Sequence, residues 1–411
     1  MLHTLSNGLR IVHSYDANTA MVAVNVLYNV GSRDESRHLT GIAHLFEHLM
    51  FGGSANVPSF DGALQAAGGK SNAWTGDDFT NFYETLPAAN LDTALWLESD
   101  RMLAVDLSEH SLEVQRAVVI EEFKQQCLDR PYGDLMHHLR RIAYAESHPY
   151  SWPVIGLEPD HIARVTRADA VNWFEGHYAP GNAVLAISGH VDFDTACKAA
   201  EEWFADVPAR PVAPRAAVNP GFPEADIIET VTGDVPYPLV VVAFPMSSYG
   251  TPEYFAADTI TDLLAVGRSS RFRTGLVVGE GKGVLSEADA SIIGCEMPGL
   301  LLLTARVADN DDALISRTRE LLIEYARRLA EPGNLSEREL RRCLNNFESN
   351  FRFSNMDYRS KATNLATAVM HGESLEHDLD VRLALTPADI RKAAADIFVR
   401  PSATVVYRPE Q

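Results

Sequence analysis

The sequence has few cysteines, no long apolar run and little positive charge, and each shortage excludes a class of protein. Four of its 411 residues are cysteines: Cys127, Cys197, Cys295 and Cys343. They stand singly, without the CxxC pairs of a zinc knuckle, so we interpret them as buried thiols. No apolar run approaches the roughly 18 residues that a membrane-spanning helix requires.

Positive charge is scarce relative to negative charge. The chain has 35 Lys and Arg against 56 Asp and Glu, for a formal net charge of -21. Such a surface repels phosphate backbones and anionic membranes unless a local basic patch intervenes, and the sequence has none. We therefore expect no nucleic-acid partner and no membrane partner. Because the first residues also lack the regions of a signal peptide, we expect a cytoplasmic protein, or a periplasmic one if such a peptide was removed.

The first half of the chain alternates strand-like and helical segments. β-Rich runs predict two adjacent strands at residues 9–13 and 21–28, joined by a turn. Apolar spacing predicts a helix from Gly41 to Phe51, then strands at 72–75 and 81–86, helices at 91–103 and 109–128, and a buried strand at 183–189. This mixture indicates an α+β domain.

A proline-rich stretch divides the chain. Five prolines between Val207 and Pro223, without apolar periodicity, predict a linker at residues 207–223 between domains at 1–206 and 224–411. The order of elements then restarts, with a strand at 238–244 and a helix at 253–266. We therefore predict an α+β fold of two similar domains, each a mixed, mainly antiparallel sheet packed against helices.

The chemistry of the chain is concentrated in the HxxEH segment from His44 to His48. Residues four apart on a helix share a face, so His44 and His48 can both direct a nitrogen at one metal ion about 2.0 to 2.1 Å away. Glu47 can reach a water on that metal without ligating it, as a general base must. The residues that flank the motif are strongly apolar, which argues against a chance stripe of polar residues on an exposed helix. The order His-x-x-Glu-His inverts the common His-Glu-x-x-His arrangement, and this inverted form is a zinc peptidase motif.

A catalytic zinc needs a third protein ligand and an open fourth position. The predicted helix at 109–128 carries two adjacent carboxylates, Glu121 and Glu122. Neighbouring residues on a helix point about 100° apart, so only one of the two can face the metal. In the second half, the positions opposite the HxxEH residues are Asp258, Thr261 and Asp262, so we expect no metal site there.

Three segments carry a family resemblance: Gly31-Ser32-Arg33-Asp34-Glu35, Thr40 to Ser54, and Gly68-Gly69-Lys70-Ser71-Asn72-Ala73-Trp74-Thr75. They resemble the inverzincin zinc metallopeptidases, which include pitrilysin, insulin-degrading enzyme and the mitochondrial processing peptidase, and in particular the half-length zinc-bearing subunits. The resemblance implies one Zn²⁺ per chain. It also implies a third ligand six positions after an arginine, and counting from Arg116 selects Glu122.

The resemblance further implies where substrate binds. An unfolded peptide adds as a strand along residues 72–75, which makes Asn72 and Ala73 candidate substrate contacts, although Asn72 could instead cap a turn. The Ser-Ser-Arg segment of the inert domain makes Arg271 a third candidate. The tyrosine that accompanies this arginine is replaced by Ser286. We therefore expect a clamshell homodimer or heterodimer in which a related subunit supplies the missing group.

The expected function is that of a zinc metalloendopeptidase acting on unfolded peptides. One alternative is a non-catalytic subunit, similar to those of the processing peptidase, that serves assembly or holds peptides. A second is a metal-dependent hydrolase with a different substrate. The peptide edge discriminates against this second alternative because strand addition requires a peptide backbone.

Overall fold

The computed structural model describes residues 1–54, 56–215, 218, 221–294 and 296–410. It divides into two compact units. Unit 1 comprises Met1–Phe123, Pro153–Ala217 and Asn350–His377, and unit 2 comprises Lys124–Trp152, Val218–Ser349 and Asp378–Gln411. Cys295 and four residues of the predicted linker, 216–217 and 219–220, lie outside the described part of the chain. No helix in that part has the length and apolar character needed to cross a membrane.

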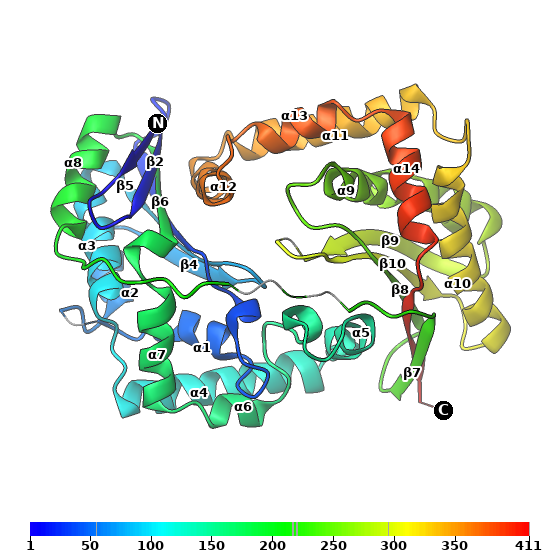
Figure 1. The fold of residues 1–411 in the computed structure, drawn as a ribbon, viewed down its shortest axis with the longest axis horizontal. Coiled ribbons are helices and arrows are strands. Elements are labelled where there is room, and N and C mark those ends of the chain that lie inside the picture. Colours follow the sequence, from blue (N-terminus) through cyan, green and yellow to red (C-terminus); the bar gives the residue numbers. More distant parts are fainter. Residues whose placement is uncertain (55, 216–217, 219–220, 295, 411) are drawn as a thin grey trace. The chain divides into compact units, whose positions relative to one another are not determined.

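Unit 1 is built on a six-stranded sheet in the order β1-β2-β6-β3-β5-β4 (Figure 1). Its strands are β1 Leu2–Thr4, β2 Arg10–Tyr15, β3 Met21–Tyr28, β4 Lys70–Thr75, β5 Thr80–Pro87 and β6 Ala183–Gly189. Its helices are α1 Ile42–Leu49, α2 Phe60–Ala66, α3 Leu91–Leu103, α4 Glu109–Phe123, α6 Pro159–Ala163, α7 Arg167–His177, α8 Phe193–Phe204 and α12 Tyr358–His371. The predicted hairpin at 72–86 and the predicted helix at 91–103 are both present.

The expectation that β2 and β3 are adjacent is wrong, because β6 lies between them. β6 pairs in parallel with β2 and antiparallel with β3. All seven residues of β6 are buried. A strand with that character is stable only where both its faces and both its edges are covered, which is the centre of a sheet. The short turn after β2 therefore connects strands that are two positions apart.

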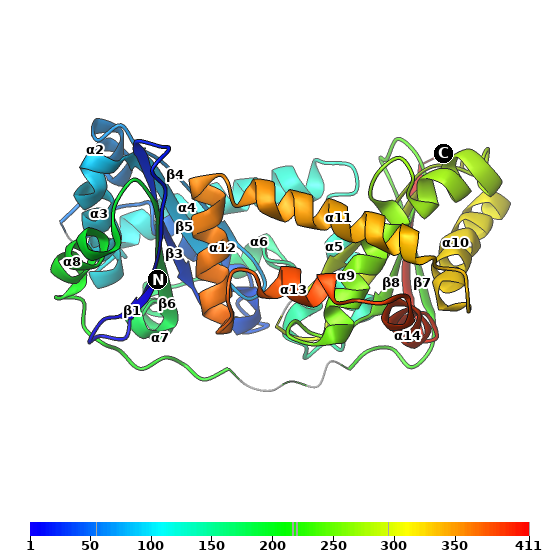
Figure 2. The ribbon, with the colours of Figure 1, turned by 90° about the horizontal axis from the view of Figure 1, so that it is seen from above.

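The two faces of this sheet are covered by helices from different halves of the chain. Ala362 and Ala366 of α12 pack on Ala23 and Leu27 of β3, while α3 and α8 pack on the sheet from the other side. Figure 2 shows α12 on one side of the strands and α2, α3 and α8 on the other. Helix α12 comes from the last quarter of the sequence, so the first half alone does not complete this unit.

Unit 2 repeats the arrangement with a five-stranded sheet in the order β7-β11-β8-β10-β9. Its strands are β7 Ile227–Gly233, β8 Leu239–Pro245, β9 Leu285–Ile293, β10 Leu300–Val307 and β11 Ala403–Pro409. Its helices are α5 Leu135–Ala143, α9 Pro252–Ala265, α10 Asp312–Arg327, α14 Pro387–Phe398, most of α13 His377–Leu383, and the larger part of α11 Glu337–Ser354. β11 enters between β7 and β8, parallel to β7, as β6 enters between β2 and β3.

The two halves of the sequence exchange a helix: α12 belongs to unit 1 and α5 to unit 2. Leu139 and Ala143 of α5, which belong to the first half, pack against Val241 and Leu302 of the second sheet. Helices α9, α10 and α14 contribute to the core on its other face (Figure 1). The fold is thus α+β with two similar, mainly antiparallel sheets packed against helices. The compact units do not coincide with continuous stretches of sequence, and the domain limits at 1–206 and 224–411 stay a prediction about the chain.

Candidate metal centre

Helix α1 presents the HxxEH residues on the one face that the core does not use. Ile42, Leu45, Phe46 and Leu49 are buried. The ring of Phe46 packs against that of Tyr178, with centroids 4.6 Å apart. The apolar side is thereby held against unit 1. His44, Glu47 and His48 take the remaining side and are half-buried, as the predicted helix requires.

Helix α4 packs against α1 and brings one carboxylate to the two histidines. Leu112, Val119 and Phe123 anchor the helix in the core. This orientation places Glu122 beside the imidazoles, whereas Glu121 is exposed. Arg116 of α4 contacts the end of α6 and the residues after it, donating hydrogen bonds to the carbonyls of Ala163 and Val165 at 3.2 and 3.0 Å.

The three donor atoms lie close enough together to hold one metal ion. Oε2 of Glu122 lies 3.4 Å from Nε2 of His48 and 3.7 Å from Nε2 of His44. Zinc bonds of 2.0 to 2.1 Å at tetrahedral angles separate neighbouring ligand atoms by about 3.3 Å. Two imidazoles and a carboxylate, with a fourth position left open, are also the donor set of a catalytic zinc. The residues therefore fit this ion, and no other such cluster occurs among the described residues.

Burial favours the neutral form of both imidazoles, which is the form that binds metal. Desolvation, helped by the neighbouring His48, lowers the pKa of His44 to about 4. Desolvation also lowers the pKa of His48, against the opposing effect of the Glu122 carboxylate. At neutral pH little free energy is then spent on removing protons before a metal binds. Nδ1 of His44 is buried and has no hydrogen-bond partner in the described part of the chain.

Glu47 is held by a residue that the sequence did not single out as its partner. The hydroxyl of Thr75 donates a hydrogen bond of 2.5 Å to Oε2 of Glu47. Burial raises the pKa of Glu47, and the Thr75 bond opposes this because it favours the ionised form. Alternation along β4 could have indicated the contact, since Ala73 and Thr75 share one face of the strand and β4 lies beside α1.

β4 forms an edge at which Ala73, one of the two residues that the sequence proposed for substrate in this strand, turns its backbone groups outward. β4 is the last strand of its sheet. Its hairpin closes with Gly76 N–H donating to the Phe79 carbonyl, and hydrogen-bonded pairs alternate from there. The peptide groups of Ala73 therefore point away from β5. The Ala73 N–H instead meets the Asn72 side-chain oxygen at 2.9 Å, a local bond that an added strand would displace.

Arg271 lies in unit 2 and its guanidinium is engaged there. It donates to both carboxylate oxygens of Glu339, at 2.8 and 2.9 Å, and to the side chain and carbonyl of Asn334. To bind substrate, Arg271 would have to give up some of these hydrogen bonds for bonds to the peptide. That role stays a prediction.

In unit 2, the residues at the positions that correspond to the histidine ligands are paired with an arginine. Asp258 and Asp262 of α9 both form ion pairs with Arg382 of α13. The Arg382 side chain is buried and lies over the ring of Phe347, 3.9 Å from its centroid. A cation from the chain itself thus pairs with both carboxylates. The pairing with Arg382 was not expected from the sequence.

Comparison with known proteins identifies relatives of this chain. Residues 10–150 match the model of insulinase, peptidase family M16, and residues 164–347 match the M16 inactive domain. The zinc protease PqqE of Helicobacter pylori is 27% identical over 98% of this chain and 91% of its own. The β subunit of the mitochondrial processing peptidase of Saccharomyces cerevisiae is 27% identical over 62% of this chain and 55% of its own.

The fold agrees with these matches. The crystal structure of a protease from Helicobacter pylori superposes with a TM-score of 0.89 at 27% identity, covering 100% of this chain and 99% of the other. The two matched models occupy both halves of the sequence, and the second carries the name of the inactive domain. This chain belongs to the M16, or insulinase, family of peptidases.

Proposed function

We propose that this chain is a zinc-dependent endopeptidase that cleaves unfolded peptides bound as an added strand on β4. The observation that carries the proposal is the hydrogen bond between Thr75 and Glu47, because it joins the peptide edge to the candidate base. The donor set of His44, His48 and Glu122, and the names of the relatives, support zinc as the metal. We propose one ion per chain.

The residues of this chain divide the reaction between them. His44, His48 and Glu122 would hold the zinc ion, which would supply Lewis acidity at the scissile carbonyl and make the attacking water more acidic. Glu47 accepts the proton from the water as the water attacks. It then delivers that proton to the departing amine. The hydrogen bond from Thr75 keeps the Glu47 side chain directed at the water during both proton transfers.

Substrate selection rests on the backbone rather than on side chains. A peptide strand alongside β4 would pair with the outward N–H and C=O of Ala73, after Asn72 releases the N–H. Such pairing tolerates many sequences but requires an extended, unfolded segment. Arg271 is proposed as an additional contact once its bonds to Glu339 and Asn334 are exchanged.

We also propose that the active form is a homodimer or heterodimer. The yeast relative is named as a subunit, and Ser286 replaces the tyrosine that the family resemblance leads one to expect. A non-catalytic subunit that holds peptides is the alternative. The presence of Glu47 together with all three ligands favours catalysis, because a chain that only holds peptides has no need of a general base. The cellular compartment stays a prediction.

Cleavage of quenched fluorogenic peptides tests the proposal. We expect hydrolysis that a chelator abolishes and added zinc restores. A matched peptide with N-methyl groups on alternate residues has the same side chains but cannot pair as a strand, and we expect it to resist cleavage. Hydrolysis that continues in chelator, or equal rates for both peptides, would contradict the proposal. Measurements with the chain alone and with a related subunit would identify the dimer that is active.

Thr75→Val should lower kcat about tenfold, a part of the 10² to 10⁴-fold that a positioned general base contributes. The variant keeps the shape of the side chain but loses the hydrogen bond that favours ionised Glu47. The pKa of Glu47 then rises further, so the acidic limb of the pH–rate profile should move to higher pH. Thr75→Ser keeps the hydroxyl and should restore both quantities. A Val variant with an unchanged profile would show that Thr75 does not position the base.

A further inference from the structure

Helix α1 cannot cap its own N-terminus. The N-cap position is Gly41, whose φ of +88° lies in the left-handed region. A Cβ there would lie 3.0 Å from the carbonyl oxygen of Ile155 and 3.1 Å from the side chain of Ile162. Glycine is therefore required, and glycine has no side chain to accept hydrogen bonds from the first turn. The free N–H groups of α1 need an acceptor from elsewhere.

Glu35 supplies that acceptor from six residues upstream. Its Oε2 accepts from the Gly41 N–H at 3.0 Å, and its Oε1 accepts from the Ala43 N–H at 2.9 Å. The Glu35 residue is only 7% exposed, so little water competes for these bonds. A carboxylate at this end also complements the positive end of the helix dipole. Bonds to an ionised acceptor are roughly twice as strong as neutral ones.

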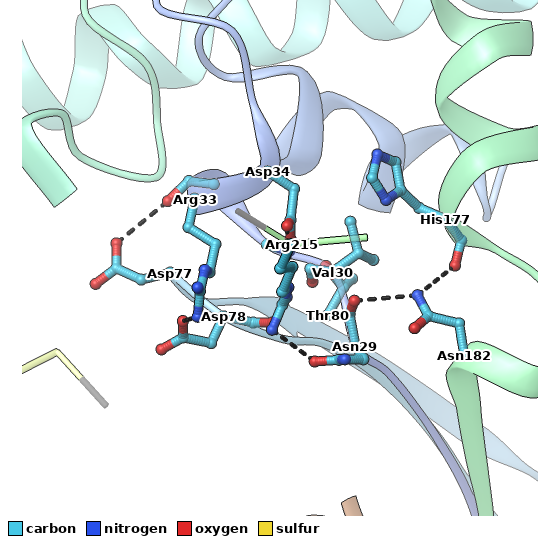
Figure 3. Close-up of polar contacts among 12 residues, drawn as sticks. Asn29, Val30, Arg33, Asp34, Asp77, Asp78, Thr80, His177, Asn182 and Arg215 are labelled. Carbon is cyan, nitrogen blue, oxygen red and sulfur yellow. Dashed lines mark hydrogen bonds and ion pairs between the residues drawn. The ribbon is translucent and has the colours of Figure 1, made fainter. Parts of the chain in front are cut away.

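The segment that carries Glu35 is itself held in place. Arg33 donates to Asp78 at 3.0 Å, and Asp34 pairs with both Nε and Nη2 of Arg215, at 3.0 and 2.8 Å. Figure 3 shows these four side chains together beneath the 3₁₀ turn at residues 32–34. Asp78 belongs to the turn between β4 and β5. The turn that precedes Glu35 is thus fixed by contacts that include the β4–β5 hairpin, and Glu35 reaches α1 from this fixed turn.

We infer that Glu35 is a positioning residue for the metal centre: by closing the first turn of α1 it fixes the place of His44. His44 directly follows Ala43, one of the two residues that Glu35 caps. Without the cap the first turn frays and His44 loses its fixed direction, while His48, one turn later, keeps its own. Metal affinity then falls because the ligands are no longer held in advance. The inference rests on the proposed function for the identity of the metal.

The test measures zinc affinity and helix order separately, on the purified full chain. Zinc affinity is read by competition with a chromophoric chelator, and exchange of the backbone amides of residues 41–46 is read in the metal-free protein. Glu35→Ala should lower affinity about 10 to 100-fold, the range seen for residues that orient metal ligands. Glu35→Gln keeps one acceptor but turns an amide N–H toward a backbone N–H, and should fall between. Exchange should accelerate in both variants.

The matched control is Asp192→Ala. Asp192 is the N-cap of α8 in the same unit and accepts from the Thr195 N–H at 2.9 Å. Its loss should lower the unfolding temperature as any cap does, without changing zinc affinity or exchange at residues 41–46. Glu35 variants that behave like this control, folded and less stable but with wild-type zinc affinity, would overturn the inference.

Two outcomes separate this inference from the proposed function. If the wild-type chain binds no zinc, the proposed function fails, and unchanged exchange in the Glu35 variants would overturn the cap as well. If the wild type binds zinc and the variants bind it equally, only the inference fails. Should Glu35→Ala not fold, Glu35→Gln carries the same comparison.

Discussion

Glu47→Gln is expected to leave zinc bound and to reduce peptide hydrolysis by at least 10² to 10⁴-fold, the usual contribution of a general base. The amide has almost the shape of the carboxylate and can still accept the Thr75 hydrogen bond. It cannot accept a proton from the attacking water. The loss should therefore appear in kcat, while KM and the metal content of the protein stay close to those of the wild type.

Metal analysis and steady-state kinetics on the same preparation would check this expectation. Equal zinc content with lost activity separates removal of the base from disturbance of the metal site. A normal rate in the variant would show that another group accepts the proton. Loss of zinc together with activity would instead make Glu47 part of the metal-binding set.

Glu122→Gln is expected to lower zinc affinity by more than about 100-fold, beyond the range for groups that act on a ligand from outside. Oε2 of Glu122 lies within 3.4 and 3.7 Å of the two imidazole nitrogens, and no other carboxylate completes this cluster in the described residues. The amide removes the negative charge that the third ligand supplies. Activity at limiting zinc should fall accordingly.

Glu121→Gln provides the matched control for this variant. It makes the same chemical change one position earlier on α4, at a side chain that is exposed. We expect zinc affinity close to that of the wild type. Chelator competition on the two variants decides between the adjacent carboxylates that the sequence pattern left open. Loss of zinc from the Glu121 variant, with retention in the Glu122 variant, would reverse the assignment.

Local features of the site could be predicted because they depend on the periodicity of one segment. His44, Glu47 and His48 share a face through helical spacing alone, and α1 forms where the apolar residues indicate it. The hairpin of β4 and β5 follows in the same way from β-rich runs around a turn. The repeat of the fold was also visible, because strand and helix signals recur in the same order after the proline-rich stretch.

Contacts between distant segments could not be predicted from such patterns. Nothing in residues 16–19 indicates that β6, more than 150 residues later, enters between β2 and β3. Likewise, the reciprocal exchange of α5 and α12 and the pairing of Arg382 with Asp258 have no local signal. Such contacts depend on which buried surfaces the whole chain can cover, and that is a property of the assembled fold.

The sequence by itself determined the type of chemistry: two imidazoles and a base on one helix, a pair of adjacent carboxylates on another, and a strand suited to an edge. Tertiary structure decided which of those groups meet. It turned Glu122 rather than Glu121 toward the imidazoles, joined Glu47 of α1 to Thr75 of β4, and brought Glu35 to a helix that must begin with glycine. The reason is physical: periodicity sets the face on which a side chain lies, whereas packing of separate segments sets what that face meets.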